Sequence, residues 1–186
     1  MKGIYLASFT AYHPNHDIVY QDINGKRDLG GDMMEIINSK KLGEYDYIIA
    51  TPPCNWWSRA NYRRNQSEYA LKTKHLLIDT IRELSCCGIP YIVENVRNDK
   101  LFKQYGLFDF PCYVYKVGRH TYWTNVQLEL DGIVQKAKTD IVNGKKRYLS
   151  SQNLARKDRQ GGEDVHQIIE LFIRKVEENG KANYIR

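Results

Sequence analysis

Short apolar runs and helical stretches alternate along this chain, and that order constrains its fold more than any other feature. The apolar runs lie at Gly3–Ala7, Ile18–Tyr20, Tyr47–Ala50 and Tyr91–Val93. A stretch from about Glu68 to Leu84, with apolar residues three to four positions apart, predicts a helix between the last two runs. Such alternation is typical of an α/β domain with a mainly parallel sheet.

The second half of the chain predicts an antiparallel hairpin and a closing helix. Tyr113–Val117 and Thr121–Val126 are strand-like runs joined around Gly118-Arg119. The last helix begins near Glu163 and carries one apolar stripe, made by Val165, Ile168, Ile169, Phe172, Ile173 and Val176. A length of 186 residues with 42% apolar content suits a single domain over residues 1–186.

Charge and composition narrow the class of partner. The net charge of +6 favours an anionic partner such as nucleic acid, although scattered surface lysines give the same total. Residues 128–159 form a short basic insert with Lys136, Lys138, Lys145, Lys146, Arg147, Arg156, Lys157 and Arg159. No apolar run approaches the roughly 18 residues of a spanning helix, so we expect a soluble, cytoplasmic protein without a membrane partner. The four cysteines and five histidines show no metal-ligand spacing, so no metal is expected, and His120 and His166 are interpreted as structural.

Two motifs carry the chemistry. Pro52-Pro53-Cys54 places a thiol on a stiff turn after one strand, and Glu94-Asn95-Val96 places a carboxyl group at the end of another. Because ligands bind beyond the carboxyl ends of parallel strands, the two side chains are expected to converge. A cysteine beside a carboxylic acid suits attack on an aromatic ring that is protonated as the sulfur adds, and cytosine is such a ring.

In order and spacing these motifs, with Trp57-Ser58 and Gly118-Arg119-His120, resemble those of DNA (cytosine-5) methyltransferases, especially the compact phage versions. The resemblance implies a Rossmann-like methyltransferase sheet. It also implies a DNA partner, S-adenosylmethionine as cofactor, and, for a phage protein, the cytoplasm of the host cell. By motif position Cys54 would be the nucleophile, Glu94 the acid on the ring nitrogen, Arg119 the residue that orients the base, and Asn95 a brace for the loop.

The N-terminal region, which binds the cofactor in the family that this chain resembles, is shorter here. The family has a Phe-x-Gly-x-Gly turn and a helix between its first two strands, whereas this chain has Ser8-Phe9-Thr10 and only about ten residues there. A parallel crossover usually needs a dozen or more residues. By resemblance the cofactor would contact Phe9, Asp22, Ile23, Asp32, Met33 and Pro52. Asp22 and Asp32 also have a plain reading as turn residues beside glycines.

The DNA-binding residues are expected beside the nucleophile and in the basic insert. They are Trp57, Ser58, Arg59, Arg63, Arg64, Lys145, Lys146 and Arg147. Cations interleaved with aromatic rings suit a nucleic-acid backbone beside an extruded base. For Trp56 and Trp57 the protein core is an equal alternative. So short an insert offers few side chains for reading bases, which predicts weak sequence preference.

Three functions remain open at this stage. The first is a DNA cytosine-5 methyltransferase. The second is a methyltransferase-like DNA-binding protein that flips or masks cytosines without methylating them, in phage protection or counter-defence. The third is a base-modifying enzyme that uses the same thiol with another one-carbon donor.

Overall fold

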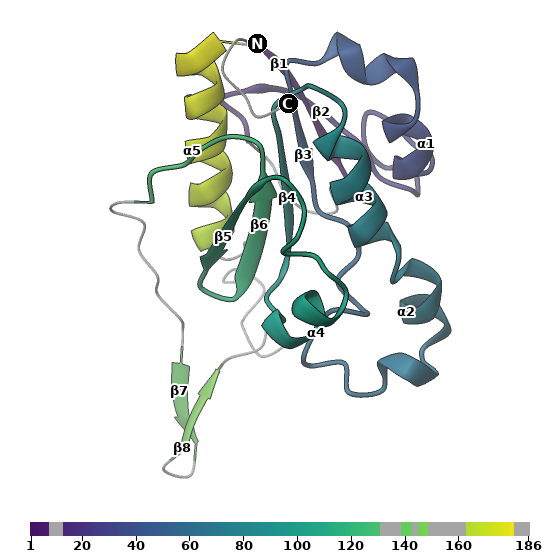
Figure 1. Ribbon diagram of the computed structural model, residues 1–186, viewed down its shortest axis with the longest axis vertical. Coiled ribbons are helices and arrows are strands. Elements are labelled where there is room, and N and C mark those ends of the chain that lie inside the picture. Colours follow the sequence, from purple (N-terminus) through teal and green to yellow (C-terminus); the bar gives the residue numbers. More distant parts are fainter. Residues whose placement is uncertain (8–12, 131–138, 143–144, 149–162, 181–186) are drawn as a thin grey trace.

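One six-stranded sheet, in the order β2-β1-β3-β4-β6-β5, organises the molecule (Figure 1). It is seen in a computed structural model that describes residues 1–7, 13–130, 139–142, 145–148 and 163–180. The strands are β1 (Lys2–Leu6), β2 (Asp17–Tyr20), β3 (Tyr47–Ala50), β4 (Tyr91–Val96), β5 (Tyr113–Val117) and β6 (His120–Thr124). Strands β1 to β4 run parallel, and β6 runs antiparallel to both β4 and β5. The predicted α/β class, mostly parallel with an antiparallel section, is confirmed.

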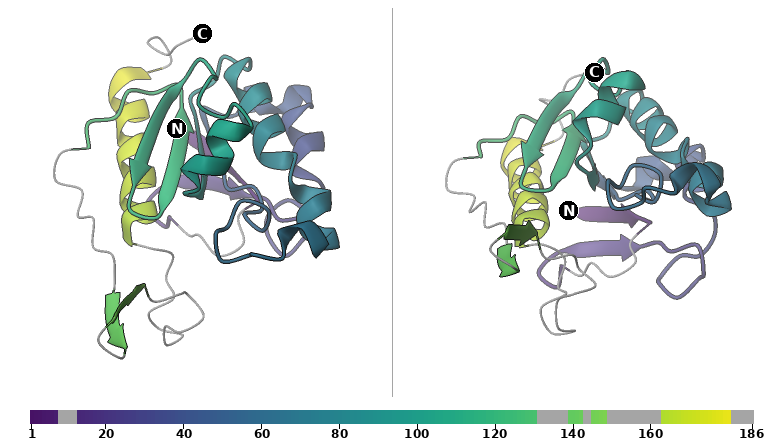
Figure 2. Two further views of the ribbon diagram at one scale, coloured as in Figure 1. Left: turned by 60° about the horizontal axis from the view of Figure 1, so that its bottom comes forward. Right: turned by 90° about the horizontal axis from the view of Figure 1, so that it is seen from below.

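Helices cover both faces of the sheet. The α-helices are α1 (Met33–Ile37), α2 (Glu68–Thr73), α3 (Leu76–Ser85), α4 (Asp99–Gln104) and α5 (Glu163–Asn179), and two short 3-10 helices are η1 (Lys40–Glu44) and η2 (Arg64–Gln66). Helix α5 lies on one face, opposite the side that carries α1 and α3 (Figure 2). Among the described residues, no helix is both long and apolar enough to cross a membrane.

Alternation along the strands builds two separate cores. In β1, Ile4 and Leu6 pack toward the α1 and α3 side, whereas Tyr5 packs toward α5. In β4, Val93 belongs to the first core and Ile92 to the second. This is the two-residue period of a strand buried on both faces.

The helix predicted from Glu68 to Leu84 is interrupted. Its backbone stays in the right-handed helical region through Lys74 and His75, but α2 ends at Thr73 and α3 begins at Leu76. The Thr73 hydroxyl donates to the Tyr69 carbonyl at 2.7 Å. Such a bond from a threonine to the carbonyl four residues earlier can bend a helix, and here it lies at the last residue of α2.

Strands β1 and β2 pair in parallel although only ten residues, 7–16, connect them. The described part of this connection, residues 7 and 13–16, contains no helix. The last turn of the connection is bound to the sheet, because the His13 backbone N–H donates to the Tyr20 hydroxyl at 2.7 Å. The structure therefore agrees with the reduced N-terminus predicted from the sequence.

Two short strands, β7 (Thr139–Val142) and β8 (Lys145–Tyr148), lie within the basic insert and pair antiparallel. The sequence did not predict them, because this stretch is polar and only weakly periodic. Lys145, Lys146 and Arg147 belong to β8, but their side chains lie outside the described residues. Their contact with DNA stays a prediction.

Gly3 has a packing requirement that can be tested. A Cβ atom at this position would lie 2.2 Å from the ring of the buried Tyr47. Gly3→Ala should therefore lower the free energy of unfolding by roughly 1–3 kcal/mol, the usual cost of overpacking. Urea denaturation measures the change. Gly43→Ala is the matched control, because a Cβ there meets nothing within 4 Å, and equal stability of the two variants would contradict the packing argument.

Candidate active site

The Cys54 turn is attached to β4 by a buried hydrogen bond. The Asn95 side chain, 1% exposed, donates from Nδ2 to the Pro52 carbonyl at 2.9 Å. Its Oδ1 accepts from the Val96 backbone N–H at 3.0 Å, which fixes the orientation of the amide. The expected brace between Asn95 and the loop is thus present, and it joins the two motifs that the sequence singled out.

The loop beyond Cys54 is anchored by further hydrogen bonds. The Ser58 N–H donates to the Cys54 carbonyl at 2.8 Å. The Arg64 guanidinium donates to the carbonyls of Ser58 at 2.9 Å and Asn61 at 3.1 Å. The Asn98 side chain donates to the Trp57 carbonyl at 2.7 Å. The thiol therefore stands at the start of a loop held at several points.

Glu94 lies within β4 rather than after it, because β4 continues beyond the end of β3. Val93 is the last residue of β4 that pairs with β3, and the next three pair only with β6. Glu94 Oε1 is 3.7 Å from His120 Nε2, and the Glu94 side chain is 14% exposed. The carboxylate is therefore partly shielded from solvent, and it lies at the carboxyl ends of the parallel strands, as Cys54 does.

The two predicted catalytic side chains are electrostatically coupled. Burial raises the pKa of the half-buried Cys54 thiol, and the negative charge of Glu94 raises it further. Burial also raises the pKa of the Tyr5 hydroxyl, and Glu94 adds to that shift as well. Cys54 is thus a thiol near neutral pH while Glu94 carries its charge, so any nucleophilic role requires that charge to be offset.

Arg119 occupies the tight turn between β5 and β6, next to Gly118 with φ of 55°. Its side chain is exposed, and its carbonyl accepts from the Arg97 N–H at 2.7 Å. The turn follows from the register, which pairs His120 with Val96 at the end of β4. Arg119 therefore lies near the carboxyl end of β4, as Glu94 does. Its role in orienting a base stays a prediction.

On the cofactor side, Asp22 and Ile23 follow β2. Asp22 is 7% exposed and Ile23 is 68% exposed. Beside them Ala7 follows β1 with a φ of 55°, a left-handed conformation that glycine adopts more readily than alanine. The Gln21 side chain accepts from the Ala7 N–H at 2.8 Å and donates to the Gly31 carbonyl at 2.6 Å, so it ties the ends of β1 and β2 to the next loop.

The other predicted cofactor residues are placed differently. Asp32 caps α1, its carboxylate accepting from the Met34 N–H at 2.7 Å. Met33, predicted as a cofactor contact, is instead buried in the core, because it starts the apolar face of α1. Pro52 is buried in the turn before Cys54. Phe9 lies outside the described residues.

The predicted DNA contact at Trp57 is wrong. Its side chain is 0% exposed and packs against Phe102 and Tyr105, with ring centroids 5.6 and 5.4 Å away. Trp56 is also buried. An indole ring has a large apolar surface, and in both tryptophans this surface is buried in the protein core.

The neighbouring polar residues divide into two groups. Arg59 and Arg63 are exposed, and the Arg63 guanidinium lies 5.5 Å from the ring centroid of Tyr62, which is 82% exposed. Ser58 and Arg64 are half-buried and hold the loop through the bonds described above. Among the predicted DNA contacts in this loop, Arg59 and Arg63 are therefore more accessible to a phosphate than Ser58 and Arg64.

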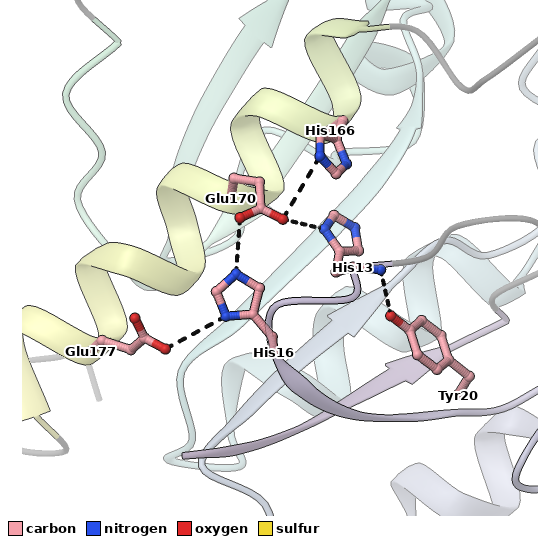
Figure 3. Close-up of polar contacts among 6 residues, drawn as sticks. All are labelled: His13, His16, Tyr20, His166, Glu170 and Glu177. Carbon is pink, nitrogen blue, oxygen red and sulfur yellow. Dashed lines mark hydrogen bonds and ion pairs between the residues drawn. The ribbon is translucent and has the colours of Figure 1, made fainter.

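A histidine cluster was missed by sequence reasoning. Figure 3 shows His13 and His16, from the connection before β2, and His166 around Glu170 on α5. The signals were two short spacings, His13 to His16 and His166 to Glu170. The second puts both side chains on one helix face, but nothing in the sequence indicated that the two segments meet.

No protein-family model matches this chain, and no curated protein matches it either.

The coupling between Glu94 and Cys54 is testable. Glu94→Gln should lower the pKa of the Cys54 thiol, because the amide keeps the shape of the side chain and removes its charge. Alkylation by iodoacetamide across a pH series, followed residue by residue by mass spectrometry, should show the Cys54 profile shifted to lower pH. Cys87 and Cys112 are internal controls, since burial raises both pKa values without a contribution from Glu94. An unshifted Cys54 profile would rule out the coupling.

The histidine cluster predicts a pH-dependent stability. Burial lowers the pKa of His13 below 6.5, outweighing the opposing effect of Glu170. Burial alone would raise the pKa of Glu170, but bonds to His13 and His16 lower it below 4.5 overall. Both depressed values mean that the unfolded chain binds protons more tightly. Stability should therefore be full above pH 6.5 and fall as the pH drops through the folded pKa of His13, then fall again below pH 4.5 through that of Glu170.

Urea denaturation at a series of pH values measures this dependence. His13→Asn should remove the upper step, since the amide keeps a hydrogen-bond donor near Glu170 but does not titrate. The other groups that face the pair, His16, His166, Glu177 and the Tyr20 hydroxyl, remain in this variant. His75→Gln, at an exposed histidine on the other side of the sheet, is the control and should keep the wild-type profile. An upper step that survives in His13→Asn would assign it to another group.

Proposed function

We propose that this chain is a DNA cytosine-5 methyltransferase that uses Cys54 as nucleophile and Glu94 as acid. The observation that carries the proposal is the junction of the two motifs. The Asn95 bond to Pro52 ties the Cys54 turn to β4, and the neighbouring Glu94 alters the pKa of the thiol. Core packing alone does not require a thiol and a carboxylate together at the carboxyl ends of β3 and β4.

The coupling suggests how the thiol is activated. While Glu94 is protonated and donates a hydrogen bond to the ring nitrogen of a bound cytosine, it places no negative charge beside Cys54. The pKa of the thiol is then lower by the part that Glu94 contributes, which favours the thiolate when the base is in place. Activation that depends on the substrate would protect the cysteine from side reactions in the free protein.

The covalent steps then balance. The Cys54 thiol loses its proton to water and its sulfur bonds to carbon 6. The electrons of the 5,6 double bond move to carbon 5, and Glu94 places its proton on the ring nitrogen. S-adenosylmethionine, when bound, would supply the methyl group to carbon 5 and keep the bonding electron pair on its own sulfur. Loss of the carbon 5 proton to water restores the double bond and expels the Cys54 thiolate, and the ring nitrogen returns its proton to Glu94.

The residues after β2 fit this cofactor in part. Asp22 is an acid at a strand end, suited to a ribose hydroxyl, and the exposed Ile23 beside it suits the face of an adenine ring. Pro52 lies at the end of β3, two strands away from β2 and beside β1. The exposed Arg59 and Arg63, with Tyr62, would hold the DNA backbone next to the extruded base.

The end of β1 favours a second candidate, the DNA-binding protein that masks cytosines without methylating them. The stretch after β1 lacks the glycines that would let a cofactor approach the backbone, and the Gln21 side chain bridges Ala7 and Gly31 across the ends of β1 and β2. A changed one-carbon donor is consistent with the same observation.

The deciding experiment measures transfer of labelled methyl groups from S-adenosylmethionine to duplex DNA. Cys54→Ser should reduce transfer by at least roughly 1,000-fold, because a hydroxyl with its high pKa cannot replace the thiolate. Binding of the same DNA, measured by fluorescence anisotropy, should be nearly unchanged. Cys112→Ser is the matched control and should retain transfer.

Calorimetric titration with S-adenosylmethionine separates the candidates. Binding that Asp22→Ala weakens would support the methyltransferase. Substantial residual transfer by Cys54→Ser would overturn the nucleophile. DNA binding without cofactor binding or transfer would favour the masking protein, and modification of free deoxycytidine monophosphate with another donor would favour the third function.

A further inference from the structure

One carboxylate on α5 is surrounded by three imidazoles (Figure 3). Glu170 Oε1 is 2.6 Å from His13 Nδ1 and 3.9 Å from His166 Nε2, and Glu170 Oε2 is 2.9 Å from His16 Nε2. His13 and Glu170 are 157 positions apart in the sequence. The fold therefore brings together donor groups from two distant segments.

The charges in this cluster do not balance as ordinary ion pairs. Three imidazoles face two carboxylates, Glu170 and Glu177, and only Glu170 lies near His13 and His166. The rings of His13 and His166 stack, with centroids 4.7 Å apart and planes at 12°, so two protonated rings would repel each other face to face. His13 is also 2% exposed, and burial lowers its pKa. The cluster thus brings ring nitrogens of His13 and His166 next to a carboxylate oxygen of Glu170.

We propose that His13, His166 and Glu170 form a binding site for a divalent first-row transition metal of the zinc class. One donor atom from each lies within 4.8 Å of the others. Two imidazoles and one carboxylate are a ligand set that zinc accepts, with room for a further ligand. Nitrogen donors favour such a metal over magnesium or calcium, which prefer oxygen.

Further contacts support the ligands as the outer partners of metal sites do. His16 binds the second oxygen of Glu170, and its other ring nitrogen lies 3.6 Å from Glu177. The His13 backbone is fixed by the Tyr20 hydroxyl at 2.7 Å. Hydrogen bonds therefore orient Glu170 and the His13 backbone before any ion enters.

Small movements would complete the site. Zinc binds nitrogen and oxygen at about 2.0–2.2 Å, so the short His13 to Glu170 contact must open to admit the ion. His166 is 54% exposed, which leaves its ring free to turn out of the stack. A neutral His13 can bind through the nitrogen that now faces Glu170 by moving its proton to the other ring nitrogen.

The test uses the full-length protein, stripped of metal by a chelator and titrated with Zn²⁺ alone. Calorimetry should find one tight site per chain, and bound zinc should raise the midpoint of thermal unfolding. His166→Gln should weaken binding by at least roughly 100-fold. His16→Gln should weaken it by about tenfold, the lower end of the usual effect of an outer partner.

Controls separate this site from other ligands. His75→Gln should bind zinc as the wild type does. Glu170→Gln keeps the shape of the side chain and should lose tight binding without unfolding. Titration with Co²⁺ should give a spectrum free of thiolate-to-metal charge transfer, because the site has no cysteine. Unchanged binding in His166→Gln and Glu170→Gln, a thiolate spectrum, or no tight site in the wild type would each overturn the proposal.

Discussion

The candidate active site depends on one buried hydrogen bond, from the Asn95 side chain to the Pro52 carbonyl. Strands β3 and β4 pair only as far as Ala50 and Val93, so the backbone ladder no longer holds the chain where the Pro52–Cys54 turn begins. The side-chain bond continues the connection beyond that point. An unsatisfied buried carbonyl costs about 1–3 kcal/mol, which makes this contact a strong constraint on the turn. Because neighbouring strand residues point to opposite faces, the same motif supplies the brace at Asn95 and the carboxylate at Glu94.

That alternation also sets the side of the sheet on which the acid lies. Glu94 points to the same side of the sheet as Ile92 and Tyr122, where α5 covers the core. A partly shielded carboxylate acts over a longer range than one in open solvent, since water screens it less. The negative charge of Glu94 opposes formation of the Cys54 thiolate, and neutralising that charge favours the thiolate. The arrangement therefore disfavours a cysteine that is constitutively reactive near neutral pH.

Sequence patterns predicted what depends on local order and failed where distant packing decides. The four parallel strands and the β5–β6 hairpin followed from short apolar runs and turn residues, and the brace at Asn95 followed from motif order. Trp57 was assigned to DNA because an aromatic residue beside cations suits both a nucleic acid and a core, and only the position of Phe102 and Tyr105 distinguishes them. Met33 was assigned to the cofactor because the stretch around Asp32 resembles a family motif, and only the packing of α1 on the sheet shows that its side chain is buried in the core. The histidine cluster could not be seen, because its two halves meet only through the docking of α5 on the sheet.

Tyr5 links the two polar groups on the α5 side of the sheet. Its hydroxyl is hydrogen-bonded to the Thr51 side chain, just before the Cys54 turn, and responds to the charge of Glu94. Its ring lies 6.1 Å from that of His13 and 6.0 Å from that of Tyr20, measured between centroids. Anything that fixes His13 therefore also restrains the buried ring between the histidine cluster and the carboxyl end of β3. The described end of the connection, residues 13–16, contains no helix and is attached to α5, because His13 and His16 both contact Glu170. These contacts join the start of β2 to the helix that covers the same face of the sheet.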